Sequence, residues 1–132
     1  MKANELMVGD WVVYRGDTEY ENPVRIEGMD IRTRALITED REDVGFDGID
    51  PIPLTAEILR KNGFETEDAK DGGFVLCDDF YDIFIYEWSD RIWVARYEST
   101  EMNIPFEQAT IGNVHELQHF LRTSCIEKEI EL

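Results

Sequence analysis

The chain has 132 residues, of which 42% are hydrophobic and 11% aromatic, enough to build one ordinary hydrophobic core. Its 30 acidic side chains outnumber 13 basic ones, and the formal charge of -17 excludes electrostatic attraction to phosphate backbones or anionic lipid over most of the surface. No apolar run approaches the roughly 20 residues of a membrane-spanning helix, and the start of the chain lacks the apolar stretch of a signal peptide. We therefore expect a cytoplasmic protein that binds neither membrane nor nucleic acid.

The first 53 residues predict a small antiparallel β-unit. Strands are expected at residues 11–14, 24–29 and 35–38, because β-branched and aromatic residues are concentrated there between turns that contain Gly and Asp. A turn-rich segment from Asp43 to Ile49 closes the region before two prolines. Four or five short strands in so short a stretch favour a strongly bent barrel of the SH3-like or OB-like kind.

Residues 54–132 predict two short helices. Thr55 is a typical N-cap for the first helix, and Asn62 with Gly63 is typical of its left-handed C-terminal end. The second helix is expected from Val114 to about Thr123, because apolar residues recur there at helical spacing.

Three strands are expected between these helices, at residues 73–77, 80–88 and 92–97, as an antiparallel meander. Apolar side chains on both faces of the middle strand favour a central strand that is covered on both sides. The tail from Cys125 to Leu132 is either an edge strand or a frayed end. The whole chain thus predicts an α+β fold, mostly antiparallel sheet with two short helices, whose two parts pack together as one globular body.

One motif requires a chemical interpretation. The segment His115-Glu116-Leu117-Gln118-His119 matches the H-E-x-x-H pattern, in which two histidines on one helix face ligate zinc and the glutamate is the general base. At about 100° per residue, however, both histidines lie almost opposite the apolar stripe of the expected helix and point outward. We therefore expect a solvated His/Glu face with no metal and no cofactor. A zinc-dependent hydrolase with Glu116 as general base remains an alternative.

The other candidate groups are interpreted as structural. Asp78, Asp79 and Asp82 lie close in the sequence but are expected to be solvated acids and not a cation site. Cys77 and Cys125 lack metal-ligand spacing and are expected to be reduced, partly buried thiols. Five aromatic residues are expected in the core and not on a recognition surface: Trp11, Tyr14, Trp88, Trp93 and Tyr97.

Three separated motifs occur in a characteristic order. They are residues 2–6 followed by 8–12, residues 51–55 followed by 57–59 and 62–64, and residues 114–118. Together they resemble a family of small uncharacterised proteins encoded by gut Bacteroides, often within phages or other mobile elements. The resemblance implies a bacterial, cytoplasmic, phage-associated protein and carries over no activity. In that family the last motif resembles Val-His-x-Leu-Gln, so His119 is a peculiarity of this chain.

The sequence favours a non-enzymatic interaction protein that binds another protein. The strong acidity, the surplus of aromatic residues and the lack of a convincing catalytic set motivate this hypothesis. In a sharper version, the acidic surface imitates nucleic acid and occupies the basic groove of a DNA-binding protein. In another alternative, a barrel binds nucleic acid through a local basic patch. That patch consists of Arg25, Arg32, Arg34 and Arg41. A homo-oligomer is left open.

Overall fold

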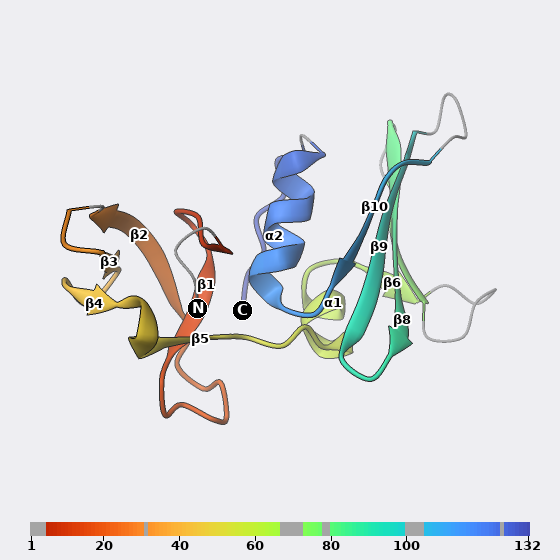
Figure 1. The fold of residues 1–132 in the computed structure, drawn as a ribbon. Helices are drawn as coiled ribbons and strands as arrows, with labels where there is room; N and C mark the ends of the chain where they lie inside the picture. Colours follow the sequence, from red (N-terminus) through yellow and green to blue (C-terminus); the bar gives the residue numbers. More distant parts are fainter. Residues whose placement is uncertain (1–4, 31, 67–72, 78–79, 100–104, 125) are drawn as a thin grey trace. The chain divides into compact units, whose positions relative to one another are not determined.

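The computed structural model describes residues 5–30, 32–66, 73–77, 80–99, 105–124 and 126–132. Two compact units make up the fold in Figure 1. The first unit consists of Met1–Ile52 with Asn113–His115, and the second consists of Pro53–Gly112 with Glu116–Leu132. Each unit contains one antiparallel sheet, and two α-helices complete the described chain, so the predicted α+β class is confirmed.

The first sheet has five strands in the order β4-β3-β2-β1-β5. The strands are β1 (Trp11–Tyr14), β2 (Val24–Asp30), β3 (Ala35–Thr38), β4 (Val44–Gly45) and β5 (Ile49–Pro51), with a 3-10 turn η2 (Phe46–Gly48) before the last. Val12 pairs with Val24 of β2 and with Pro51 of β5, so β1 is internal. In the described residues β4 and β5 each pair on one side only, so the sheet is open, where the sequence predicted a barrel. Strands of two and three residues offer few backbone groups with which to close it.

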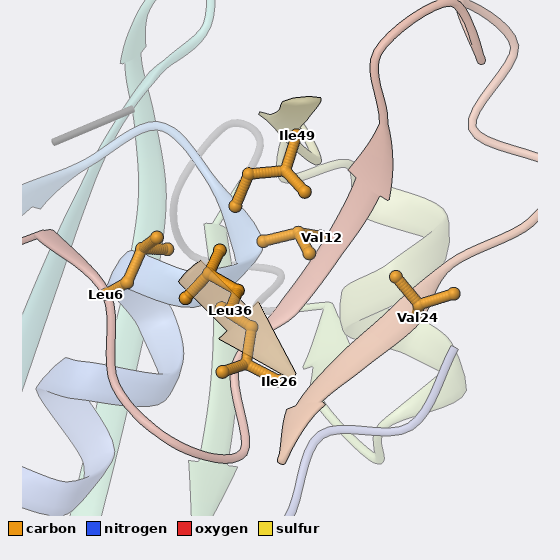
Figure 2. Close-up of a cluster of buried hydrophobic side chains, with 6 residues drawn as sticks. All are labelled: Leu6, Val12, Val24, Ile26, Leu36 and Ile49. Carbon is orange, nitrogen blue, oxygen red and sulfur yellow. The ribbon is translucent and has the colours of Figure 1, made fainter. Parts of the chain in front are cut away.

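The first unit contains a cluster of buried apolar side chains, drawn in Figure 2, in which five residues come from strands of the first sheet and Leu6 precedes β1. Its buried members are Leu6, Val12, Val24, Ile26, Leu36 and Ile49. The chain enters β1 through a tight turn in which Met7 donates its backbone N–H to the buried carboxylate of Asp10 at 2.8 Å. Burial of Asp10 is tolerated because its oxygen accepts this hydrogen bond.

The second sheet also has five strands, in the order β10-β9-β8-β7-β6. They are β6 (Glu65–Thr66), β7 (Gly73–Cys77), β8 (Tyr81–Ser89), β9 (Ile92–Ser99) and β10 (Pro105–Ile111). The expected meander corresponds to β7, β8 and β9 and is confirmed, with β8 shifted by one residue. The two outer strands, β6 and β10, were not predicted.

The two faces of the second sheet differ in burial. Ile85 lies between Phe74 of β7 and Ala95 of β9, and all three side chains are buried. On the opposite face Phe84 is half-buried, and the side chain of Trp88 is 70% exposed. The prediction that β8 is covered on both sides is therefore wrong for this second face. Aromatic residues suit an exposed strand surface as well as a core, so their presence alone does not distinguish the two.

Helix α1 (Ala56–Lys61) has the predicted ends. The side chain of Thr55 accepts a hydrogen bond from the backbone N–H of Ile58 at 3.2 Å, and Gly63 adopts a left-handed φ of 86° just after Asn62. Helix α2 (Val114–Thr123) has the predicted boundaries as well. Its apolar stripe is buried as expected, and consists of Val114, Leu117 and Leu121.

Candidate functional site

The two histidines of the H-E-x-x-H sequence lie in different environments. The side chain of His115 is 5% exposed, whereas that of His119 is half-buried. The expectation that both histidines point outward is therefore wrong. The buried surface of α2 is wider than its apolar stripe, and it includes the polar side chains of His115 and Gln118. The spacing of the three apolar residues in the stripe does not predict that these polar neighbours are buried as well.

Glu116, the weak catalytic candidate, makes a local backbone contact. Its Oε1 atom accepts a hydrogen bond from the backbone N–H of Gly112 at 3.2 Å. Glu116 is the third residue of α2, where an acidic side chain commonly reaches back to the chain before the helix and is stabilised by the helix dipole. The contact gives Glu116 a structural role at the start of α2.

Gly112 is itself confined. A Cβ atom at this position would lie 3.0 Å from the carbonyl oxygen of Arg91, in the β8–β9 turn. Closer contacts are not found for real Cβ atoms without a shift of their neighbours, so a side chain at residue 112 would be crowded. Gly112 and Glu116 together therefore define how the chain passes from β10 into α2.

The other candidate ligands do not assemble into a metal site among the residues that the structure describes. Nowhere in those residues do three or more His, Cys, Asp or Glu side chains meet in a way that could hold a metal ion. Cys77 is a free thiol, but it is exposed, so the expected partial burial is wrong for this residue. Asp82 is half-buried on β8. The predictions for Asp78, Asp79 and Cys125 concern positions outside the described residues.

A groove of about 610 Å³ lies in the second unit between β10 and α2, the neighbouring strand and helix in Figure 1. It is lined by Gln108, Ala109, Thr110, Ile111, Glu116, His119, Phe120 and Thr123. Four of these residues are consecutive in β10. Successive side chains of a strand point to opposite faces of the sheet, so a lining of four residues in a row fits a space that lies along the edge of the strand.

The helical wall of the groove is equally regular. Its four residues are spaced i, i+3, i+4 and i+7, which is one face of a helix. At 1.5 Å per residue this face extends for about 10 Å, and the strand wall at 3.3 Å per residue extends for about 10 Å as well. Glu116 and His119 are therefore parts of a groove wall, next to the aromatic ring of Phe120.

The four arginines of the predicted basic patch have different surroundings in the first unit. The guanidinium group of Arg25 packs on the ring of Trp11 at 4.9 Å, and that of Arg41 packs on the ring of Tyr14 at 4.0 Å. Two of the four arginines are thus held against aromatic rings. Arg32 and Arg34 are exposed near the β2–β3 turn.

The ring of Tyr14 also organises a polar cluster. Its hydroxyl donates a hydrogen bond to the carboxylate of Asp40 and lies 2.6 Å from the hydroxyl of Thr38. The hydrogen bond from Tyr14 lowers the pKa of Asp40 below its usual value. Burial, and next the hydrogen bond to Asp40, raise the pKa of Tyr14. Both shifts favour the state in which the Tyr14 phenol keeps its proton and the Asp40 carboxylate is charged. The hydrogen bond between them in this state stabilises the loop after β3.

The aromatic residues are divided between core and surface. Trp93 is buried and packs against Phe74 with ring centroids 6.2 Å apart, as expected of a core residue. Tyr97 is half-buried beside Tyr81. Trp88 is exposed at the end of β8, so its assignment to the core is wrong.

Compared with protein-family models, curated proteins and solved structures, the chain matches none. Within the described ranges, no helix has the length and apolar character needed to cross a membrane.

Sequence reasoning identified one wall of this groove only. Glu116 and His119 were selected through the motif. The strand wall was missed because residues 105–111 have no regular apolar alternation. Their strand is defined by pairing with β9, for example Ala109 with Ala95, which is a tertiary contact.

Proposed function

We propose that this chain is a non-enzymatic protein-binding module and that the groove between β10 and α2 is its binding site. One observation carries the proposal: the same groove is lined by four consecutive residues of β10, an outer strand of its sheet among the described residues, and by one face of α2. Grooves of this form, with a mixed apolar and polar lining, suit a segment of another protein. The engagement of Glu116 with the backbone of Gly112 favours binding over hydrolysis.

The charge of the chain defines the chemistry of the partner in this proposal. With a formal charge of -17, the protein attracts basic partners over long range and accelerates their encounter. The proposed partner is therefore a protein with a basic surface. Imitation of nucleic acid is the special case in which that surface normally binds DNA.

We also propose that the first unit is an incompletely closed variant of an SH3-like barrel and that the chain is a cytoplasmic member of the phage-associated Bacteroides family that its motifs resemble. The strand order supports the first point, because β5 follows a 3-10 turn and returns to pair with β1. The location of the gene among phage early genes would support a role in host takeover. A location among structural genes would support a role in assembly.

A random-peptide display library, selected on the immobilised full-length chain, tests the proposed binding function. We expect selected peptides whose binding is lost in Thr123→Trp, because this exposed residue lines the groove and indole would fill it. The matched control is Thr66→Trp, at an exposed position on β6, the opposite edge of the same sheet. A library that yields no binder, or binders equally insensitive to both variants, would refute the proposed site.

A further inference from the structure

We infer that the groove accepts an extended basic peptide, which adds to the second sheet as a further strand beside β10. This inference rests on the proposed binding function and specifies its ligand and its mode. The occupant is a segment of a foreign protein with alternating basic and apolar side chains.

The backbone of β10 supports strand addition. In the described chain β10 pairs with β9 and with no other strand, so its second edge carries N–H and C=O groups that no strand satisfies. The register irregularity of β10 lies between Pro105 and Glu107, so residues 108–111 form a regular segment opposite β9. The groove coincides with this regular segment.

The walls of the groove match the geometry of an extended chain. An extended peptide beside residues 108–111 spans the same distance of about 10 Å with three or four residues. Its alternate side chains point toward the face of the sheet that carries Ala109 and Ile111, where the half-buried Ala109 offers apolar surface, whereas Ile111 and Phe120 are buried. The intervening side chains project to the side of Gln108 and Thr110, which are polar.

The charge of the groove and of the whole protein favours a basic peptide over other ligands. Among the described residues, the lining includes the carboxylate of Glu116 and neither lysine nor arginine. A lysine or arginine of the peptide therefore meets an acidic groove on an acidic protein. A second copy of this chain would bring another formal charge of -17 to the same edge, which opposes edge-to-edge dimers.

The probe is a capped seven-residue peptide of alternating lysine and valine, titrated into the isotopically labelled protein at about 150 mM salt, where long-range attraction is screened. Two further peptides carry N-methyl groups on all lysines or on all valines. Alternate backbone N–H groups point to opposite edges of a strand, so each peptide lacks the donors of one edge and keeps its full charge. NMR shifts give the affinity, and hydrogen exchange reports on the amides of residues 108–111.

We expect one N-methylated peptide to bind at least about tenfold more weakly and the other to bind nearly as tightly as the parent, because two lost hydrogen bonds are worth at least this factor. Amide exchange in residues 108–111 should slow when the parent peptide binds. Glu116→Gln keeps an oxygen that can accept from Gly112 and removes the charge, and should weaken binding by about threefold. A glutamate-valine peptide should not bind.

Equal affinity of the two N-methylated peptides, with unchanged exchange in β10, would overturn strand addition and indicate attraction by charge alone. The proposed function would survive that result if displayed peptides still lost binding in Thr123→Trp. Concentration-dependent dimers of the protein without peptide, suppressed by Thr123→Trp, would assign the edge to a second copy and overturn the inference.

Discussion

Asn62 and Glu131 are joined by two hydrogen bonds although 69 residues separate them. The Nδ2 atom of Asn62 donates to the backbone carbonyl of Glu131 at 2.8 Å, and the backbone N–H of Glu131 donates to Oδ1 of Asn62 at 2.7 Å. The same Nδ2 atom also donates to the carbonyl of Ile58 at 2.8 Å. A residue that ends α1 therefore also holds the C-terminal tail in place.

Replacement of this side chain is predicted to destabilise the second unit. Asn62→Ala removes three hydrogen bonds and leaves both backbone groups of Glu131 without this partner, at a cost of about 2 kcal/mol in the free energy of unfolding. Urea denaturation measures the loss, and faster amide exchange of Glu131 locates it. Asn22→Ala, at an exposed position, is the control and should change stability by less than about 0.5 kcal/mol. Equal stability of the two variants would contradict the prediction.

Replacement by alanine should have different effects on stability at two glycine positions. Gly112→Ala places a Cβ 3.0 Å from the carbonyl oxygen of Arg91 and should cost about 1–2 kcal/mol. Gly45→Ala meets no atom within 4 Å and has an ordinary φ of -68°, so its stability should be unchanged or slightly raised. Thermal unfolding of both variants compares them directly. A neutral Gly112→Ala would show that the turn before α2 is not crowded.

The two histidines should differ in their contribution to stability. His115→Ala removes a buried side chain and should cost about 1–3 kcal/mol, whereas His119→Ala should cost about 0.5 kcal/mol. Protein purified without added metal should contain far less than one zinc per chain, as elemental analysis would show. Stoichiometric zinc that is lost in both variants would contradict this prediction and would make Glu116 the candidate general base.

The Tyr14–Asp40 hydrogen bond should appear in the pH dependence of stability. Because this bond lowers the folded-state pKa of Asp40, its stabilisation is present above the usual aspartate pKa and is lost as the pH falls through the lower folded value. Tyr14→Phe should raise the pKa of Asp40 toward its usual value, as an NMR titration of the carboxyl carbon would detect. Tyr20→Phe, at an exposed tyrosine, is the control. An unchanged Asp40 titration in Tyr14→Phe would rule out this coupling.

The sequence predicted best those elements whose signals are local. Strand β3 and both ends of α1 follow from β-branched residues, the Thr55 N-cap and Gly63, each acting within a few residues. Strand β10 could not be found in this way, because it depends on pairing with β9. The tail was predicted as an edge strand or a frayed end and is neither, since Ile126 and Ile130 are buried and Asn62 binds its backbone.

The candidate site was predictable in part for the same reason. The motif selected Glu116 and His119, but local spacing suggested zinc chemistry, and only the fold shows that both residues line a groove beside a strand. The burial of His115 was equally out of reach, because it depends on what packs around the first turn of α2. Local sequence patterns predict where a helix or strand begins and ends, whereas the residues that pack against one face of a helix depend on the whole fold.

Within the described ranges, the outer strands of both sheets pair on one side only, and these open edges affect how the protein should be handled. At neutral pH the surplus of carboxylates keeps neighbouring molecules apart and prevents the edge strands from pairing between them. Near the isoelectric point of about 4.3 this repulsion vanishes, while the edges and the exposed ring of Trp88 remain. Acidified solutions should therefore become turbid. Added salt at neutral pH screens the same repulsion and should also promote association. Mildly alkaline buffers of low ionic strength are the conditions in which we expect it to remain monomeric.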